Sequence, residues 1–345
     1  MLTEKQILEI REHLEKAQNP VFLYDNDVDG FCSYVLLRRY IGRGKGVAVK
    51  SHPDIDRQYA KKAQELKADY VFVLDRPLLG KAFVEEIKDL QLPLVWVDHH
   101  DMDEEEIDYG NVHIYNPQKN RKVDSSTTYL CYKSTNRVED MWIAMIGSIA
   151  DHFLPDFAEK FGEMYPEYWS KGIFAPFDAY YNTGIGRLAR AISFGLKDSV
   201  THVVALQNFV IGAKGPAEID AELESTHAFA TKYQEILKKY SALLDRARKN
   251  VEGNLLFFNY SGTLSISSDL SNELCHIHPK KYVVVAYSSG PITNISMRGK
   301  NVKKILGEII PMLSAATGGG HTDAVGSRIQ TSDLERFKEE LLKRI

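Results

Sequence analysis

The sequence is poor in cysteine and has no long hydrophobic run. Its three cysteines (Cys32, Cys131 and Cys275) are odd in number and far apart among 345 residues, so a disulfide framework is excluded. No apolar stretch approaches the roughly 18 residues that a membrane span needs. The chain opens with a polar segment that is typical of a helix start and unlike a signal peptide. These features predict a cytoplasmic protein that does not associate with a membrane.

The sequence also lacks an excess of charge of either sign. Lysine and arginine number 43 against 47 aspartate and glutamate residues, which gives a formal net charge of −4. A basic field that would draw the whole protein to nucleic acid is therefore excluded, and any bound polyanion must be held by a local site. Hydrophobic residues at 44% and charged residues at 26% are ordinary for a globular chain, and the length suggests about two domains.

The first 150 residues alternate between short apolar runs and helical stretches. Strands are predicted in four runs rich in β-branched residues: 21–24, 47–49, 70–74 and 94–97. Helices are predicted between and after them, near 3–17, 31–41, 57–66, 82–90, 125–133 and 140–149. This alternation is typical of βαβ units around a buried parallel sheet, so the predicted fold class is α/β.

The remainder of the chain divides into two further parts. Residues 161–181 are unusually aromatic, and after Gly215-Pro216 an apolar stripe predicts one long connector helix. Strands are expected again at 255–258, 282–287 and 292–297, in alternation with helices. We therefore predict an α/β domain at 1–155, a helical insert and connector at 156–250, and a smaller α/β domain at 251–345.

Aspartates follow the predicted strands of the first domain at the points where those strands end. Asp25, Asp27 and Asp29 follow the first strand, Asp75 follows the third, and Asp98 follows the fourth. Because ligands bind at the carboxyl ends of parallel strands, these acids are expected to meet at one edge of the sheet. A lone aspartate after a strand is more often a helix cap or a turn residue, but three strands deliver acids here.

The chemistry of these side chains favours a metal centre. His99 and His100 follow Asp98, and a further acid, Asp151, ends an apolar helical run. Six acids at one edge would repel one another without cations. An EF-hand calcium loop is excluded because its twelfth position, counted from Asp25, is Leu36. Carboxylates with imidazoles suit manganese or magnesium, and two such ions about 3.5–4 Å apart would activate water for hydrolysis of a phosphoester.

At this point the motifs resemble those of a known family. The Asp25-x-Asp27-x-Asp29-Gly30 segment, Asp75, the Asp98-His99-His100 triplet and Asp151 are similar, in this order, to the four motifs of the DHH phosphoesterases. The resemblance implies a metal-binding catalytic domain at 1–155 that holds two manganese ions, with magnesium as the alternative. It implies that the metal ligands are Asp25, Asp27, Asp29, Asp75, His99 and Asp151. Asp75 would bridge the ions, Asp98 would orient His99, and His100 would lie near the scissile phosphate.

A glycine-rich segment near the end of the chain extends the resemblance. Gly318-Gly319-Gly320-His321-x-x-Ala324-x-Gly326 is similar to the signature of the DHH-associated C-terminal domain. The resemblance implies that this second α/β domain binds substrate phosphate through Gly318, Gly319, Gly320 and His321. Ser296 and Arg298 resemble a strand segment whose arginine clamps a phosphate.

Several features have two interpretations each. Many family members carry histidine where Asp25 stands, and aspartate there resembles the RecJ-like nuclease branch of archaeal type. Arg76, beside Asp75, is unusual and is interpreted either as a phosphate contact or as a surface salt bridge. Residues 124–127 predict a helix N-cap, and the resemblance places such serines and threonines close to the metals. The aromatic residues of 161–181 either pack against one another or stack on nucleobases.

The function predicted from these observations is that of a metal-dependent phosphodiesterase. A RecJ-like exonuclease that hydrolyses single-stranded DNA or RNA to 5′-mononucleotides is the first interpretation. Hydrolysis of small nucleotides, namely cyclic dinucleotides, short oligoribonucleotides or 3′-phosphoadenosine phosphate, is the alternative, because this class shares every motif. A non-catalytic scaffold with a replication or repair partner is a third and weaker interpretation, because all the acids are present.

Overall fold

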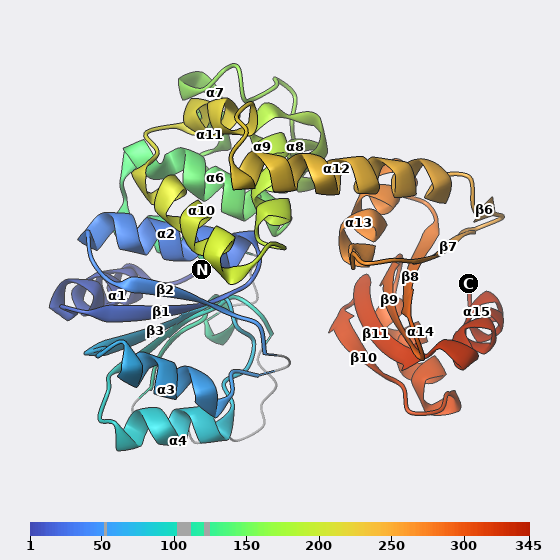
Figure 1. Cartoon of the computed structure of the whole chain (residues 1–345), viewed down its shortest axis with the longest axis horizontal. Helices are drawn as coiled ribbons and strands as arrows, with labels where there is room; N and C mark the ends of the chain where they lie inside the picture. Colours follow the sequence, from blue (N-terminus) through green and yellow to red (C-terminus); the bar gives the residue numbers. More distant parts are fainter. Residues whose placement is uncertain (52–53, 102–111, 121–124) are drawn as a thin grey trace. The chain divides into compact units, whose positions relative to one another are not determined.

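The chain divides into two compact units, Met1–Tyr233 and Gln234–Ile345. The computed structural model in Figure 1 describes residues 1–51, 54–101, 112–120 and 125–345. The division between the units falls within helix α12 (Ala228–Ala247). Each unit has its own sheet, so each is described by itself.

The first unit is built on a five-stranded sheet in which every neighbouring pair is parallel. The strands lie in the order β2-β1-β3-β4-β5, with bounds β1 (Pro20–Asp25), β2 (Lys45–Val49), β3 (Tyr70–Leu74), β4 (Leu94–Val97) and β5 (Val112–Tyr115). The apolar runs of β3 and β4 are almost entirely buried, as expected of strands covered on both faces. The predicted α/β class with a parallel N-terminal sheet is confirmed.

Helices cover both faces of this sheet. Helix α2 (Val28–Ile41) lies on one side, and α3 (Arg57–Glu65) and α4 (Lys81–Asp89) lie on the other, where they close an apolar core over β1, β3 and β4 (Figure 1). Helices α5 (Thr127–Thr135) and α6 (Met141–Ala150) pack against α2. All residues of α6 except Ala150 are buried, which explains why its sequence is apolar on every side.

More helices complete the first unit: α1 (Glu4–Lys16), α7 (Ala158–Met164), α8 (Pro176–Asn182), α9 (Gly184–Gly195), α10 (Val200–Gly212) and α11 (Pro216–Leu223). The prediction of one continuous helix after Gly215-Pro216 was wrong, because α11 and α12 are separate helices. The chain breaks at residues 224–227, where the Ser225 hydroxyl accepts a hydrogen bond from the His227 amide. A serine side chain that binds nearby backbone in this way competes with helix formation.

The second unit holds a six-stranded mixed sheet in the order β10-β11-β9-β8-β7-β6. Its strands are β6 (Val251–Glu252), β7 (Leu255–Ser261), β8 (Tyr282–Ser289), β9 (Ile292–Arg298), β10 (Thr317–His321) and β11 (Ala324–Gln330). Helices α13 (Ser267–Ile277), α14 (Val302–Ile309) and α15 (Leu334–Leu342) accompany them. The glycine-rich segment is strand β10, at the edge of the sheet and exposed throughout.

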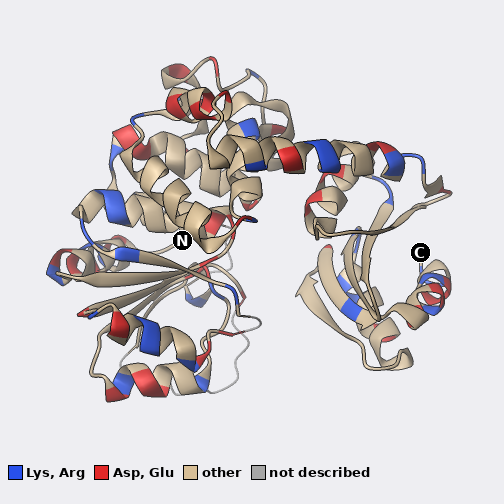
Figure 2. Cartoon of the chain, in the orientation of Figure 1, with Lys and Arg blue, Asp and Glu red and all other residues tan. Residues whose placement is uncertain are grey.

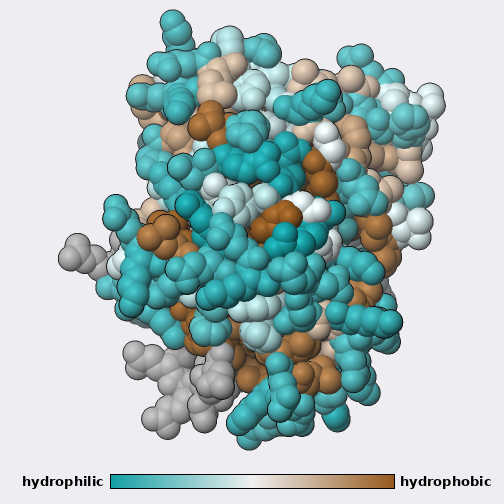
Figure 3. All heavy atoms as spheres, turned by 90° about the vertical axis from the view of Figure 1, so that its left-hand side faces the viewer, coloured by the Kyte–Doolittle hydropathy of each residue, from teal (hydrophilic) through white to brown (hydrophobic). Residues whose placement is uncertain are grey.

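Charged residues of both signs are distributed over the surface, as expected from the near-neutral net charge of the chain. Lysine, arginine, aspartate and glutamate are spread over the helices, with further acidic residues where the strands of the first sheet end (Figure 2). The face drawn in Figure 3 is mostly hydrophilic, and its hydrophobic residues are scattered. Within the described ranges, no helix is both long enough and apolar enough to cross a membrane.

Candidate functional site

The predicted acids of the first unit lie at the carboxyl edge of the parallel sheet. Strand β1 ends at Asp25, β3 leads into Asp75, and β4 leads into Asp98. Strand β1 has β2 on one side and β3 on the other, so the strand order changes direction next to β1, and such a switch point is where α/β sheets bind ligands. Asp75 and Asp98 are only 2% and 1% exposed, so both carboxylates lie in the interior of the site.

Asp29 is held by the N-terminus of helix α5. Its two carboxylate oxygens accept hydrogen bonds from the amides of Thr127 and Thr128, each at 2.8 Å. Thr127 also donates its hydroxyl to Asp75 Oδ1 at 3.0 Å. The cap of this helix is Ser126, and Asp124 lies outside the described residues. The positive end of the α5 dipole therefore faces two of the predicted metal ligands, and the sequence prediction missed the role of Thr128.

Asp75 adopts an uncommon backbone conformation. Its φ angle is 60°, in the left-handed region that residues other than glycine rarely occupy. The Asp75 amide donates to the carbonyl of Val97 at 3.0 Å, which fixes the segment against the end of β4. Such strained positions cluster at functional sites, so the strain here agrees with a functional role of the carboxylate.

His99 lies at the centre of the candidate metal site. Its Nε2 atom is 3.3 Å from Asp151 Oδ2 and 3.5 Å from Asp75 Oδ1. Ligand atoms of Asp29, His99 and Asp151 lie within 4.8 Å of one another, and so do those of Asp75, His99 and His100. The two groups share His99. Carboxylates with imidazole are the donor set of manganese or magnesium, so these residues fit a divalent ion.

Asp98 contacts His100, whereas the sequence analysis expected it to orient His99. Asp98 Oδ1 lies 2.9 Å from His100 Nδ1, and Asp98 Oδ2 accepts from the His100 amide at 3.0 Å. Asn116, just after β5, donates to Asp98 at 3.2 Å and to the His100 carbonyl at 2.9 Å. The carboxylate and the amide together fix the position of the His100 ring. The sequence did not indicate Asn116, because it is distant along the chain and follows no recognised motif.

The carboxylates and imidazoles shift one another's pKa values. Burial lowers the pKa of His99, but the facing carboxylates of Asp151 and Asp75 outweigh it and raise that pKa well above its ordinary value. Burial likewise opposes the charge of His100, and the hydrogen bond to Asp98 nevertheless raises its pKa to about 9. Burial raises the pKa of Asp151 to about 6. Without metal, the positive charge of this site therefore comes from the protonated imidazoles of His99 and His100.

Asp25 and Asp27 contact groups outside the cluster at His99. Arg76 Nη1 lies 2.9 Å from Asp25 Oδ1, so the salt bridge suggested for Arg76 is present, but it joins a buried guanidinium to an Asp25 side chain that is 31% exposed. Asp27 caps helix α2 by accepting a hydrogen bond from the Gly30 amide at 2.9 Å. Among the described residues, no group of three ligand atoms includes Asp25 or Asp27. The described ligand atoms thus gather into two overlapping three-ligand groups, both of which include His99.

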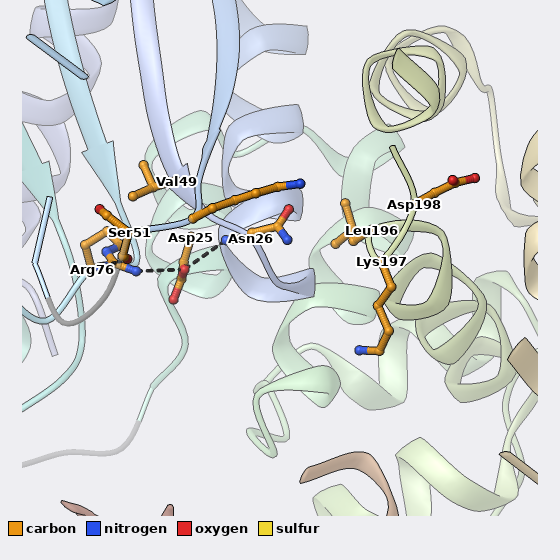
Figure 4. A pocket seen from close by; sticks show the side chains of 9 residues that line it. Asp25, Asn26, Val49, Ser51, Arg76, Leu196, Lys197 and Asp198 are labelled. Atoms are coloured by element: carbon orange, nitrogen blue, oxygen red, sulfur yellow. Dashed lines mark hydrogen bonds and ion pairs between the residues drawn. The ribbon is translucent and has the colours of Figure 1, made fainter. Parts of the chain in front are cut away.

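A cavity of about 410 Å³ opens beside the Asp25–Arg76 pair. It is lined by residues from the ends of β1 and β2, by Arg76 and by the segment that joins α9 to α10: Asp25, Asn26, Val49, Lys50, Ser51, Arg76, Leu196, Lys197 and Asp198 (Figure 4). Three of these side chains are cationic and two are acidic, which leaves a formal charge of +1 that favours an anionic ligand. Its volume is within the range of small-molecule sites.

The predicted phosphate-binding residues of the second unit share one sheet. Strand β11 lies between β9 and β10, so Ser296, Gly326 and Gly319 form one row across the three strands. Arg298, Ala324 and His321 form a second row. The guanidinium of Arg298 donates to Asn272 at 2.6 Å and to Ser268 at 3.0 Å, which fixes its position. Gly318 and Gly320 lie on β10 on either side of Gly319.

Comparison with known proteins agrees with this arrangement. Residues 21–154 match the model described as the DHH family, N-terminal domain. The matched segment contains all the acids of the candidate site and both histidines, His99 and His100. A comparison with curated proteins finds no match.

Solved structures show the same fold at low sequence identity. RecJ from Thermus thermophilus in complex with Mn²⁺ has a TM-score of 0.67 and 14% identity over 99% of this chain, which spans 55% of that protein. An exonuclease RecJ bound to manganese has a TM-score of 0.64 and 14% identity over 99% of this chain and 94% of that one. A pGpG-specific phosphodiesterase from Vibrio cholerae has a TM-score of 0.51 and 14% identity over 95% and 98%.

Metal affinity is expected to rise with pH. Ligands must lose their protons to bind a metal, and the raised pKa of His99 keeps its imidazole protonated near neutral pH. The apparent Mn²⁺ affinity should therefore rise about tenfold per pH unit for each proton released. Below pH 6, where Asp151 also takes up a proton, the dependence should become steeper. Calorimetric titration in buffers of different ionisation enthalpy measures both the affinity and the proton release.

A matched variant isolates the contribution of Asp151. Asp151→Asn removes the carboxyl group that titrates at about 6, so the steeper part of the pH dependence should disappear. Exposed Asp89 on α4 gives the control, Asp89→Asn, which should keep the full pH dependence. An affinity that is independent of pH would contradict the protonated state described above.

Proposed function

We propose that this chain is a phosphoesterase, and specifically an exonuclease that removes 5′-mononucleotides from single-stranded DNA or RNA with the aid of manganese. One observation carries the proposal: acids from strand ends and helices converge on His99, next to a cavity lined by three cationic and two acidic side chains. The TM-scores of 0.67 and 0.64 for two RecJ structures, against 0.51 for the pGpG-specific phosphodiesterase, support the nuclease over the small-nucleotide enzyme. Magnesium is the alternative ion, since a further similar structure is RecJ with Mg²⁺.

Asp29, Asp75, His99 and Asp151 would hold the divalent ion. When bound, such an ion lowers the pKa of a coordinated water and withdraws charge from a phosphoryl oxygen. The chain's own contribution is to fix the ligands before the ion arrives. Asp29 is held by two backbone amides and Asp75 by the Thr127 hydroxyl, so both carboxylates are oriented by donors that do not titrate.

His100 would act on the phosphate directly. Its Nδ1 atom is bound to Asp98, and its raised pKa of about 9 keeps the ring protonated at neutral pH in the absence of metal. A protonated imidazole at this position can stabilise negative charge that develops on the phosphate oxygens. Asp98 is thus a positioning residue, whereas Asp75 and His100 are the residues proposed to face the reacting groups.

Phosphate binding is proposed for two groups of residues. In the first unit, Lys50, Lys197 and Arg76 line the cavity and favour an anion. In the second unit, Ser296, Arg298, Gly318, Gly319, Gly320 and His321 lie on adjacent strands of one sheet. A nearby aromatic pair favours a nucleotide over inorganic substrates, because Phe177 stacks on His152, the neighbour of Asp151, at a ring distance of 4.1 Å.

Hydrolysis of small nucleotides is the second candidate. A cavity of about 410 Å³ has room for a single nucleotide, and the pGpG-specific phosphodiesterase has the same fold as this chain. A role beside a replication or repair protein stays a prediction, as does assignment to the archaeal type of RecJ-like proteins.

Replacing Asp75 tests the metal-dependent chemistry. Asp75→Asn keeps the size of the side chain but removes the charge that faces His99 and His100. Since loss of an outer partner of a metal site already costs 10–100-fold, we expect the rate of Mn²⁺-dependent phosphodiester hydrolysis to fall by more than about a hundredfold. The release of nucleotides from a labelled oligonucleotide measures the rate. Asp89→Asn is the control, and retained turnover in Asp75→Asn would disprove the role of this carboxylate.

Chain-length dependence separates the two candidate substrates. An exonuclease should degrade a labelled single-stranded 20-mer at a rate within about tenfold of that for a dinucleotide, because each turnover acts on one strand end. A small-nucleotide enzyme should be confined to substrates of two or three nucleotides. Digestion of DNA and RNA ladders labelled at the 5′ or the 3′ end decides between them and also gives the direction of digestion.

Gly319 tests phosphate binding by the second unit. A Cβ atom at Gly319 would meet no heavy atom within 4 Å, so Gly319→Ala should leave the free energy of unfolding within about 0.5 kcal/mol. If the β10 backbone receives substrate, the added methyl group should raise KM about tenfold, which corresponds to about 1.4 kcal/mol. Gly307→Ala in α14 is equally uncrowded and is the matched control. Equal KM values in the two variants would exclude contact between Gly319 and substrate.

A further inference from the structure

Cationic side chains gather where strand β9 leads into helix α14. Arg298 ends β9, and it is followed by three exposed lysines, here called the lysine patch: Lys300, Lys303 and Lys304. Residues 290–307 contain no acidic residue. The chain turns sharply between the two elements, because Gly299 and Asn301 have φ angles of 144° and 56°. The turn thus places the patch close to Arg298, which is predicted to bind phosphate.

Hydrogen bonds fix the backbone of the lysine patch against the turn that follows strand β10. The Lys303 amide donates to the carbonyl of Thr322 at 3.1 Å. The Asn301 amide donates to Asp323 Oδ1 at 2.7 Å. This turn directly follows His321, so the lysine patch adjoins the row of predicted phosphate-binding residues that crosses β9, β11 and β10.

The acidic residues beside the lysine patch bind other groups. Asp323 accepts its hydrogen bond from the backbone, as described above. Glu308 lies four residues after Lys304 on α14, but its carboxylate is 3.2 Å from Arg344 Nε. Within the ranges that the structure describes, no ion pair includes a lysine of the patch. The positive charge of the patch is therefore available to an anionic ligand.

Two of the lysines occupy an unfavourable position on α14. Lys303 and Lys304 stand in the first turn of this helix, which contains no acidic residue. The N-terminus of a helix carries a partial positive charge, so it repels cations and stabilises anions. The two lysines therefore destabilise α14 in the free protein, and a bound anion would remove the repulsion. Such a conflict with the rules of helix stability is typical of functional sites.

We propose that the lysine patch binds the phosphodiester backbone of a single-stranded nucleic acid, beyond the nucleotide that Arg298 and His321 hold. Flexible lysines act as point charges, so they attract backbone phosphates without reading the bases. A dinucleotide has one internucleotide phosphate, whereas the patch adds three cations to those already proposed to bind phosphate, so only a longer strand can use them. The inference rests on the proposed function and names long strands as the preferred substrate class.

The salt dependence of KM tests this proposal. Hydrolysis of a labelled single-stranded 20-mer and of a dinucleotide is followed with the full-length chain at fixed Mn²⁺, between about 50 and 200 mM salt. Each phosphate contact with a single strand contributes about 0.7 to the slope of log affinity against log salt, so Lys300→Gln/Lys303→Gln/Lys304→Gln should lower that slope by about 2. Its KM for the 20-mer should rise about tenfold with kcat unchanged, and its KM for the dinucleotide should stay within about twofold. Arginine at the same three positions retains the charge and should restore the slope.

Three exposed lysines in and just after α3 provide the matched control. Lys61→Gln/Lys62→Gln/Lys67→Gln removes the same charge from the first unit and should leave the slope unchanged. An unaltered slope in the patch variant, or an equal rise of KM for the 20-mer and the dinucleotide, would overturn the proposed strand site and leave the exonuclease standing. Confinement of the unaltered protein to substrates of two or three nucleotides would overturn both.

Discussion

The burial of carboxylates at one edge of a parallel sheet is the constraint on which this site depends. Asp29, Asp75 and Asp98 are each no more than 2% exposed, and a buried carboxylate without donors or a countercharge is strongly destabilising. Each acid therefore has its own compensation. Asp29 receives two amides of helix α5, Asp75 receives a threonine hydroxyl and faces two imidazoles, and Asp98 is bound by His100 and Asn116.

The parallel topology explains why these compensating groups come from distant parts of the chain. Consecutive parallel strands return to the same edge only after a crossover connection, so Asp25, Asp75 and Asp98 are separated along the sequence by whole βα units. The groups that donate hydrogen bonds to these acids also come from strand connections. Thr127, which donates to Asp75, begins the helix after β5, and Asn116, which donates to Asp98, directly follows β5. The edge of the sheet is thus assembled from short segments, each of which is fixed by the buried strand before it.

The acids at strand ends could be predicted because their signal is local. An apolar run followed by aspartate places a carboxylate at the end of a strand, and the parallel class then places those ends together. The partners of the acids carried no such signal. Whether Asp98 binds His99 or His100 depends on the backbone turn between adjacent residues, and the Arg76–Asp25 pair joins residues 51 positions apart. Strand β10 was missed because three successive glycines have low strand propensity, and pairing with β11 outweighs it.

The source of positive charge decides how such a site responds to its surroundings. The net charge of −4 provides no general attraction for phosphate, so attraction must arise from cations at the site. A bound ion supplies charge that varies with metal concentration and, through His99 and Asp151, with pH. An arginine supplies charge that varies with neither. If the proposed function is right, the cationic side chains of the cavity, Lys50, Lys197 and Arg76, attract an anionic substrate before metal binds, whereas hydrolysis requires the ion at His99. Substrate binding and turnover can therefore depend differently on metal, although both take place at one edge of one sheet.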